Sequence, residues 1–323
     1  MASSILPPLQ LPLAFLSLIL IAPAVMAQLS NDYYAATCPN VESLVRSSLR
    51  STFTTDITAP AAMIRLLFHD CQVDGCDASI LLVEGGSGNS IEMKSPLNLG
   101  VRKLNLIDRL KAQLESECPQ TVSCADIIAL AARDAVALSG GPDISIPLGR
   151  LDGFSASSSA ATSALPKATV SVSDAISLFG AMQMNLEESV SMLGSHTVGV
   201  AHCTNFKNRL YPRMDRDLGL LFGATLQTRC PRLSPIDLVA TLDTSFLRFD
   251  NSYFQNVLNR RALLTIDSEI AHDPRTGPIV QNFAQDEDAF FNAFASGFVK
   301  LANFNVLSGS QGEVRVDCRS VNG

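Results

Sequence analysis

Apolar residues recur at helical spacing along most of the chain, and several of these runs start with residues that cap helices. Ser123 and Asp126 form a capping box ahead of the apolar positions between Ile127 and Leu138. The triplet Gly140-Gly141-Pro142 then ends the run. We therefore predict a buried, central helix in this segment.

Three further helices are predicted on the same grounds. Ser171 with Asp174 opens one amphipathic run. Asn185 with Glu188 caps a second. The next predicted helix carries an apolar stripe, which we interpret as protein core rather than as a ligand-binding surface, made of Phe290, Phe294, Phe298 and Leu301.

Strand patterns are short and few, and Ile144-Ser145-Ile146 is the clearest of them. The Ser/Ala/Thr-rich tract 155–163 predicts a surface loop that would separate two lobes. We find no internal repeat. The chain of 323 residues, 47% of them hydrophobic, can bury a substantial core. The fold class predicted is mainly α, in one large domain or two lobes.

The N-terminus predicts a secretory signal peptide over residues 1–27. Its apolar stretch, Leu11 to Val25, is short and broken by prolines, and small residues precede a cleavage site after Ala27. An uncleaved anchor is the alternative, because no Lys or Arg precedes Arg46. The mature domain would be residues 28–323, without a membrane-spanning segment.

The charge and the cysteine content indicate which partners the protein can have and how its cysteines are used. The net charge is −7, only 17% of residues are charged, and no basic stripe is present, which argues against nucleic acid or an anionic membrane as partner. Eight cysteines in a secreted chain predict four disulfides, although spacing alone allows about 105 pairings. Zinc binding is the rival use of cysteine, but no C-x-x-C occurs.

Arg65 and His69 are the two residues that tell most about the chemistry of this protein. Four residues apart on a helix, they project from one face, so a fixed cation and a neutral imidazole can meet over one small substrate. Imidazole can accept and return a proton, while guanidinium stabilises developing negative charge. The pair predicts heterolysis of a polar bond, and a solvated surface pair is the alternative.

A second histidine, His196, stands among small and apolar residues where a flat ligand could approach closely. Together these segments resemble the secreted plant haem peroxidases, the class III family, over essentially the whole mature chain. The motifs that carry the resemblance are Arg65-Leu66-Leu67-Phe68-His69-Asp70-Cys71, Val73-Asp74-Gly75-Cys76-Asp77-Ala78-Ser79, Val122-Ser123-Cys124-Ala125-Asp126, Gly149-Arg150-Leu151-Asp152-Gly153, His196-Thr197-Val198-Gly199 and Phe249-Asp250-Asn251.

The resemblance implies a two-lobed haem peroxidase fold, with haem b between a distal and a proximal helical lobe. It implies that His196 ligates the haem iron and that Asp267 accepts its other ring N–H. On the distal side it implies that His69 accepts the proton of hydrogen peroxide and that Arg65 stabilises the transition state. Two supporting residues follow from the same resemblance, Asn98 on His69 and Glu92 on Asn98.

Two calcium ions are also implied. The first would be held by hard oxygen donors of the loop after His69, namely the side chains of Asp70, Asp77 and Ser79 and the backbone carbonyls of Val73 and Gly75. The second would be held by Thr197, Asp243, Ser245 and Asp250, together with the backbone carbonyl of Arg248. The segment between Asp243 and Asp250 is one residue shorter than the family pattern and lacks its Thr-Pro, so the position of Ser245 departs from that pattern.

The family's disulfides map onto the pairs Cys38 with Cys118, Cys71 with Cys76, Cys124 with Cys318, and Cys203 with Cys230. Pro166 resembles the family's substrate-binding motif near the haem edge, although the residues after it differ. The implied function is one-electron oxidation of phenolic, including lignin-type, donors, with removal of hydrogen peroxide under oxidative stress. We expect a secreted, extracellular or cell-wall monomer.

Two other classes stay open on the sequence. The first is a secreted, calcium-stabilised binding or structural protein that keeps the peroxidase scaffold without turnover. The second is a zinc hydrolase using His69, Asp70 and His196, for which the chain lacks H-E-x-x-H spacing. Neither His202 nor His272 has a motif role, and we expect both to be surface or structural residues.

Overall fold

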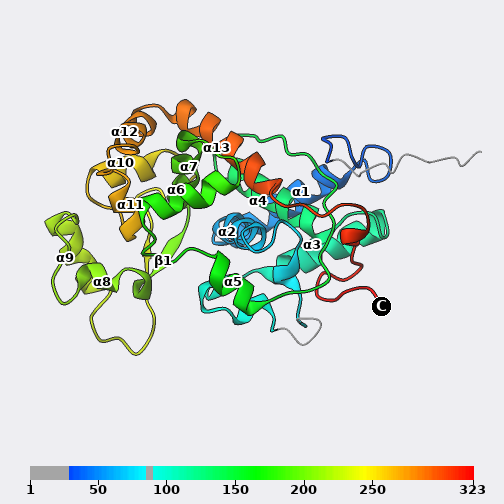
Figure 1. Ribbon diagram of the computed structural model, residues 1–323, viewed down its shortest axis with the longest axis horizontal. Helices are drawn as coiled ribbons and strands as arrows, with labels where there is room; N and C mark the ends of the chain where they lie inside the picture. Colours follow the sequence, from blue (N-terminus) through cyan, green and yellow to red (C-terminus); the bar gives the residue numbers. More distant parts are fainter. Residues whose placement is uncertain (1–28, 85–89) are drawn as a thin grey trace, which may run out of the picture.

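The structure is a computed structural model that describes residues 29–84 and 90–323, so the predicted signal peptide, residues 1–27, lies outside the described residues. Within the described part, thirteen α-helices and a single two-stranded antiparallel sheet are present (Figure 1). No helix in that part is long and apolar enough to cross a bilayer. The predicted mainly α fold is confirmed.

The helices have the following bounds: α1 Val41–Thr55, α2 Ala59–Cys71, α3 Leu104–Glu117, α4 Cys124–Leu138, α5 Ser158–Ala164, α6 Val172–Ala181, α7 Leu186–Leu193, α8 Lys207–Leu210, α9 Leu220–Arg229, α10 Ser252–Leu258, α11 Thr265–Glu269, α12 Gly277–Gln285 and α13 Glu287–Ala302. The sheet pairs β1 Val200–His202 with β2 Val239–Thr241, so that Ala201 faces Ala240.

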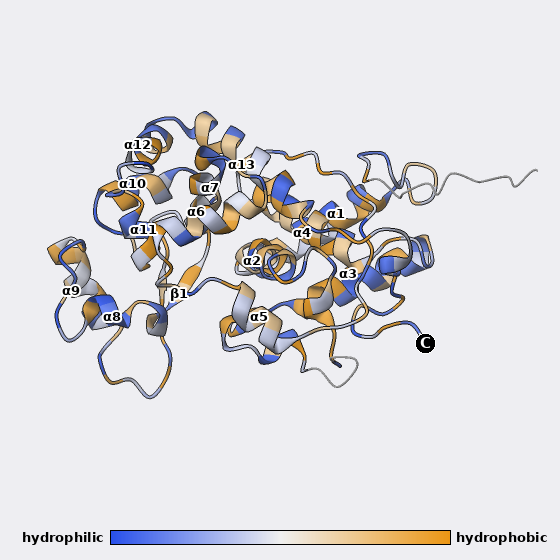
Figure 2. Cartoon of the chain, viewed as in Figure 1, coloured by the Kyte–Doolittle hydropathy of each residue, from blue (hydrophilic) through white to orange (hydrophobic). Residues whose placement is uncertain are grey.

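Helix α4 is the centre of one half of the molecule, where α1, α2 and α3 all pack against it. Every residue of α4 from Cys124 to Val136 is buried. In the other half α10 packs on α12, while α13 contacts α7, α12 and also α2. Figure 1 shows α1 to α5 on one side and α8 to α12 on the other, and Figure 2 shows α2 and α4 as mostly apolar helices. Helix α13 therefore joins the two halves.

The four helices predicted from capping residues and apolar spacing are present as α4, α6, α7 and α13. The capping box of α7 is complete, with Asn185 and Glu188 bonding each other's backbone N–H. The box of α4 is only half formed. The Ser123 hydroxyl accepts the N–H of Asp126, but the Asp126 carboxylate accepts from the buried Arg150 instead, at 2.7 Å. Leaving the buried guanidinium without a charged partner would destabilise the fold more than the loss of a second cap on the helix does.

Two local predictions are wrong. Residues 144–146 form no strand, because no described segment pairs with them and the nearest bridge joins Ser30 to Leu148. The tract predicted as a loop contains α5, whose first turn is capped by the Ser157 hydroxyl. Ala161 of this helix is fully buried in a small apolar cluster with Val73 and Leu165. This tertiary packing stabilises the short helix, and the local sequence gives no sign of it.

Four disulfides are present, and no described cysteine is free. They join the pairs that the family resemblance implies: Cys38 with Cys118, Cys71 with Cys76, Cys124 with Cys318, and Cys203 with Cys230. The third of these closes a loop of 194 residues and attaches the C-terminal segment to the start of α4.

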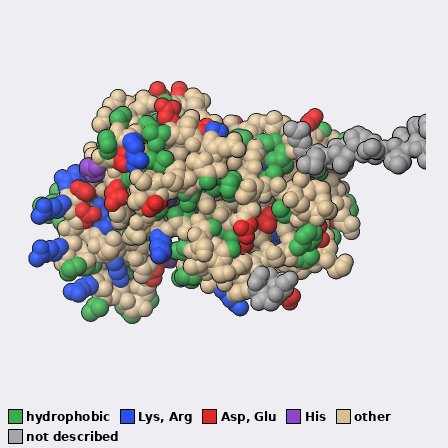
Figure 3. Space-filling model, viewed as in Figure 1, with side chains coloured by type: hydrophobic (Ala, Val, Ile, Leu, Met, Phe, Trp, Pro, Cys, Tyr) green, Lys and Arg blue, Asp and Glu red, His purple; other side chains and the backbone are tan. Residues whose placement is uncertain are grey.

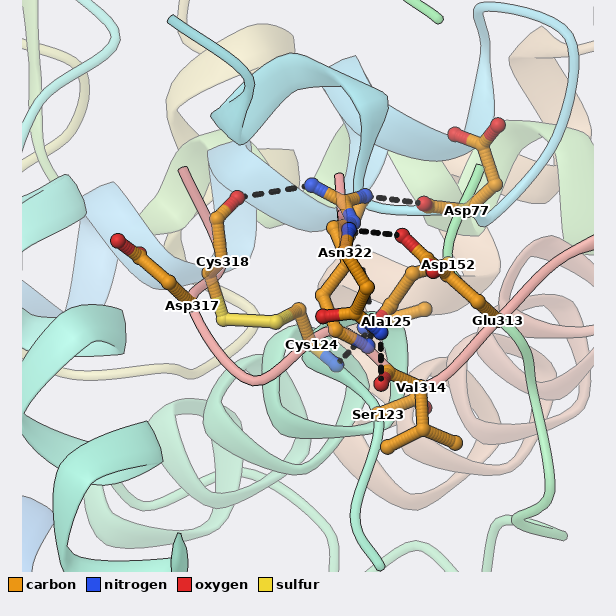
Figure 4. A network of polar contacts seen from close by, with 12 residues as sticks. Asp77, Ser123, Cys124, Ala125, Asp152, Glu313, Val314, Asp317, Cys318 and Asn322 are labelled. Carbon is orange, nitrogen blue, oxygen red and sulfur yellow. Dashed lines mark hydrogen bonds and ion pairs between the residues drawn. A yellow bond between two sulfur atoms is a disulfide. The ribbon is translucent and has the colours of Figure 1, made fainter. Parts of the chain in front are cut away.

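Asp152 holds the same junction by hydrogen bonds (Figure 4). Its carboxylate accepts the backbone N–H of Cys124 at 3.0 Å, of Ala125 at 2.8 Å and of Arg315 at 2.9 Å. The Arg315 side chain is fully buried and donates to the carbonyls of Cys318 and Asp77. A carboxylate at the N-terminus of α4 thus satisfies orphan helix donors and balances a buried cation.

Replacing Asp152 by Ala should therefore destabilise the protein strongly, by roughly 3 to 5 kcal/mol, because three backbone N–H groups lose their acceptor and the buried Arg315 guanidinium loses the carboxylate that lies 4.0 Å from its Nε. The measurement is the melting temperature by calorimetry. Asp288→Ala, at an exposed position of α13, is the matched control. A melting temperature for Asp152→Ala as high as that of the control would contradict this account.

Candidate active site

Helix α2 places Arg65 and His69 on one face, four residues apart. Pro60 stands in the first turn of this helix, where a backbone N–H has no acceptor in the helix to lose. Nε of Arg65 donates to Nε2 of His69 at 3.0 Å, and Nη2 of Arg65 donates to the Leu99 carbonyl at 3.1 Å. The guanidinium and the imidazole therefore form one unit.

The other ring nitrogen of His69 is held by Asn98. Nδ1 of His69 lies 2.7 Å from Oδ1 of Asn98, and Nδ2 of Asn98 donates to the backbone carbonyl of Glu92 at 2.8 Å. This orientation of the amide makes Oδ1 the acceptor, so we assign the His69 proton to Nδ1. Nε2 then carries the lone pair that a proton acceptor needs. Glu92 contacts Asn98 through its backbone, not through its carboxyl group.

Burial and charge keep His69 neutral. Burial first, and then the positive charge of Arg65, lower the pKa of His69 to about 3, although the hydrogen bond to Asn98 opposes the shift. The Arg65 pKa is lowered as well, by burial and by the charge of Arg102. At neutral pH this site therefore presents an unprotonated imidazole beside a cation.

His196 lies in the 3-10 turn Gly194–Thr197 that follows α7. A Cβ on Gly194 would stand 2.5 Å from the Phe290 ring, so glycine is needed for this turn to pack against α13. Nδ1 of His196 is 3.0 Å from Oδ1 of Asp267 in α11. Burial opposes protonation of His196, but the charge of Asp267 and this hydrogen bond outweigh it and raise the pKa.

The residues on the two sides fit an iron porphyrin. Nε2 of His196 makes no hydrogen bond to any described residue, and the side chain remains 31% exposed. An imidazole with one nitrogen bonded to a carboxylate and the other free is the arrangement of a metal-ligating histidine. The charge of Arg65 also lowers the pKa of His196, so the two segments are within electrostatic reach of each other. Figure 3 shows a notch in the surface between the part with α8 and α9 and the part with α5.

The residues expected to bind the first calcium form a buried, acidic loop. Oδ1 of Asp70 has no hydrogen-bond partner among the described residues, and Oδ2 accepts the N–H of Ala78 at 3.0 Å. Burial, and then the charges of Asp77 and Glu92, raise the Asp70 pKa well above its usual value. Gly75 has φ of +121°, which allows the tight turn between the two carboxylates. A buried carboxylate oxygen without a partner fits a cation at this place.

The side chains expected around the second calcium also converge. The Thr197 hydroxyl donates to Asp243 at 2.6 Å, and the Ser245 hydroxyl donates to Asp250 at 2.8 Å. Ser245 thus joins the cluster in spite of the shortened segment. The Arg248 side chain lies 3.8 Å from Asp250 and is 67% exposed. Burial, and to a smaller extent the charge of Asp250, raise the Asp243 pKa to about 6.

Neither of the two proposed calcium clusters brings together three described His, Cys, Asp or Glu side chains. Across residues 29–84 and 90–323 no three His, Cys, Asp or Glu side chains lie close enough to hold a metal ion. Each cluster has two carboxylates, so the other ligands would have to be hydroxyl and carbonyl oxygens, which calcium accepts.

Pro166 follows Leu165, which is buried beside Val73 and Phe68 of α2. The segment therefore runs close to the helix of His69.

Sequence reasoning missed two neighbours of the site. The Tyr253 hydroxyl donates to the same Asp267 oxygen that contacts His196. His202 lies near the distal pair, since a Cβ on Gly100 would be 3.2 Å from Arg65 and 3.5 Å from His202. No spacing rule could have indicated either contact, because each joins residues far apart in the chain. The only signal was that Tyr253 stands two residues after Asn251, the end of the Phe249-Asp250-Asn251 motif.

Comparison with known proteins gives the family. A family model described as "Peroxidase" matches residues 45–286. The chain is 48% identical to Peroxidase 29 of Arabidopsis thaliana over 301 residues, which cover 91% of this chain and 89% of that protein. It is 42% identical to Peroxidase 57 of the same plant over 315 residues, with coverage of 96% and 97%. It is 39% identical to Peroxidase 4 of Vitis vinifera over 313 residues, with coverage of 94% and 95%.

The chain belongs to the peroxidase family, in the group of plant class III peroxidases. It is a haem peroxidase that uses hydrogen peroxide as its oxidant and small organic molecules as donors. This confirms the family, fold and enzyme class expected from the motifs, and it disfavours a scaffold without turnover.

From the low pKa of His69 we predict how the rate of reaction with hydrogen peroxide depends on pH. The rate should be flat from neutral to mildly acidic pH and fall with a midpoint at about pH 3, where His69 becomes protonated. In Arg65→Gln the loss of the cation should raise the His69 pKa, so the midpoint moves to higher pH. Stopped-flow rates against pH measure it, with the exposed Arg50→Gln as control. Equal midpoints in Arg65→Gln and the control would count against the charge effect.

Proposed function

We propose that this peroxidase oxidises phenolic donors in one-electron steps at haem b held between His196 and His69. The observation that carries the proposal is the state of the two imidazoles: each has Nδ1 fixed by an acceptor, Asn98 or Asp267, and Nε2 left for chemistry. When bound, the haem supplies the iron at which the peroxide O–O bond breaks and which then accepts electrons from donors one at a time.

On the distal side His69 and Arg65 handle the proton and the charge. Nε2 of His69 takes a proton from one peroxide oxygen and returns it to the other, which leaves as water. Arg65 stabilises the negative charge that develops on the departing oxygen. Nε of Arg65 bonds Nε2 of His69 in this structure, so that hydrogen bond has to open when peroxide is the proton donor. Asn98 keeps the His69 proton on Nδ1 throughout.

On the proximal side His196 is the proposed iron ligand. Asp267 accepts the Nδ1 proton and so leaves the lone pair of the ring on Nε2, which lies on the far side of the imidazole from Asp267. A hydrogen-bonded imidazole is also a stronger electron donor, which favours the oxidised states of the iron. Asp267 is 1% exposed, so this effect acts in a low dielectric.

Pro166 and its neighbours are the proposed donor-binding segment, and phenols are the proposed donors. The support is the position of Leu165 against Phe68, next to His69 in α2. Small apolar side chains along such a segment suit an aromatic ring that must come close to the haem without reaching the distal pair. The absence of Trp from the chain excludes tryptophan as a surface electron relay.

Two calcium ions are proposed as structural cofactors, at the clusters of Asp70 and Asp77 and of Asp243 and Asp250. Each cluster starts at the residue after a proposed catalytic or ligating histidine, because Asp70 follows His69 and Thr197 follows His196. Calcium would remove the repulsion between paired carboxylates and fix the backbone on which each histidine stands. The support is the unpartnered Asp70 oxygen and the converging oxygens of the second cluster.

We further propose export, with residues 1–27 as a cleaved signal peptide and 28–323 as a monomeric mature domain in the cell wall or extracellular space. Support comes from the apolar N-terminal stretch and from four disulfides, which persist in oxidising compartments. Partners would be hydrogen peroxide and phenols, not nucleic acid.

His69→Ala tests the distal mechanism. The rate of reaction with hydrogen peroxide should fall by about 10² to 10⁴, because the general base is lost, while haem stays bound. Stopped-flow absorbance and steady-state oxidation of guaiacol measure it. The control is His272→Ala, at an exposed position outside the site. A His69→Ala enzyme as fast as the control would refute the role of His69.

Chelation tests the calcium sites. Removing calcium should lower the melting temperature, since a ligand at 100 times its Kd stabilises the folded state by about 2.7 kcal/mol. Added calcium should restore it, and Asp243→Asn should show a smaller chelator-dependent loss than Asp288→Asn. A melting temperature that does not respond to chelator would argue against both ions.

A further inference from the structure

Asp267 has a second hydrogen-bond donor, which the sequence did not indicate. The Tyr253 hydroxyl is 2.8 Å from Oδ1 of Asp267, and Nδ1 of His196 is 3.0 Å from the same oxygen. The three residues come from separate elements: α10 carries Tyr253, α11 carries Asp267, and the turn after α7 carries His196. A single carboxylate oxygen is thus shared by a phenol and an imidazole.

The geometry and the burial of Tyr253 fix it as a donor. It is 2% exposed, and its ring packs edge-on against Phe254, with centroids 4.9 Å apart, and toward His196 at 6.1 Å. Burial, and then the charge of Asp267, raise the pKa of Tyr253 well above its usual value. Because a carboxylate oxygen can only accept, the hydroxyl at 2.8 Å is the donor in this contact.

We propose that Tyr253 is a positioning residue that limits how strongly Asp267 attracts the Nδ1 proton of His196, and thereby sets the donor strength of Nε2. This inference rests on the proposed role of His196 as iron ligand. Two donors on one oxygen compete for the same electron density, so each bond weakens the other. The competition is strong here because the shared acceptor, Asp267, and the competing donor, Tyr253, are both buried, so that solvent does not replace a weakened bond to Asp267.

The proposal fixes the direction of change when the hydroxyl is removed. In Tyr253→Phe the ring and its packing remain, but Asp267 binds the His196 proton alone and gives the imidazole more anionic character. The bond between His196 and iron should then be stiffer, and the oxidised iron more stable. If Tyr253 only held Asp267 in place, its loss would weaken the contact and shift both properties in the opposite direction, as Asp267→Asn does by removing the charge.

The experiment is resonance Raman spectroscopy of the ferrous haem-loaded protein, with the reduction potential of the iron measured in parallel. Tyr253→Phe should raise the iron–histidine stretching frequency and lower the potential, and Asp267→Asn should do the reverse. Tyr211→Phe is the matched control, because its hydroxyl donates to the carbonyls of Gln227 and Cys230 and not to Asp267. An unchanged frequency in Tyr253→Phe, or a shift in the direction of Asp267→Asn, overturns the proposal.

A second measurement keeps the test decisive if Tyr253→Phe fails to fold. Only four tyrosines are present, so the chain can be labelled throughout with 3-fluorotyrosine, whose hydroxyl is a stronger donor. The label should lower the iron–histidine frequency in the parent protein, and no shift would overturn the proposal.

Failure of the underlying function is recognised separately. If His196 is not the iron ligand, the parent shows no iron–histidine band and His196→Ala leaves the absorption spectrum unaltered.

Discussion

The structure of this site depends on the fixing of one nitrogen in each of two imidazole rings. Asn98 holds Nδ1 of His69 and Asp267 holds Nδ1 of His196, so the position of the proton on each ring is decided by a neighbour. Everything proposed for the reaction follows from the nitrogen that remains. Without these two hydrogen bonds either ring could rotate or change tautomer, and neither Nε2 would have a defined task.

The two histidines are given opposite electrostatic surroundings. The distal ring is buried beside a cation, and its pKa falls to about 3, whereas the carboxylate beside the proximal ring outweighs burial and raises its pKa. A ring that stays neutral next to Arg65 can accept a proton from a weak acid. A ring bonded to Asp267 is a better electron donor to a metal. The functions proposed for the two rings thus differ because the charge of the partner differs.

The scaffold supports each histidine through the residue that follows it. Asp70 is buried in an acidic loop closed by the disulfide between Cys71 and Cys76, and Thr197 joins the cluster of Asp243. The acidic loop is in turn fastened to the C-terminal segment, since Arg315 donates to the Asp77 carbonyl. Packing, cross-links and the proposed calcium ions therefore act on the same short stretches of backbone that carry the reactive side chains.

The sequence by itself determined the helical class, the main helices, the pairing of Arg65 with His69 and, through its motifs, the family. These features are local, since they depend on residues within a turn or two of each other. The tertiary structure decided what involves distant segments: the failure of residues 144–146 to form a strand, the half-formed cap of α4, and the contact of Tyr253 with Asp267. Burial and pairing across the fold have no periodic signal in the chain, because each contact depends on where other elements come to lie.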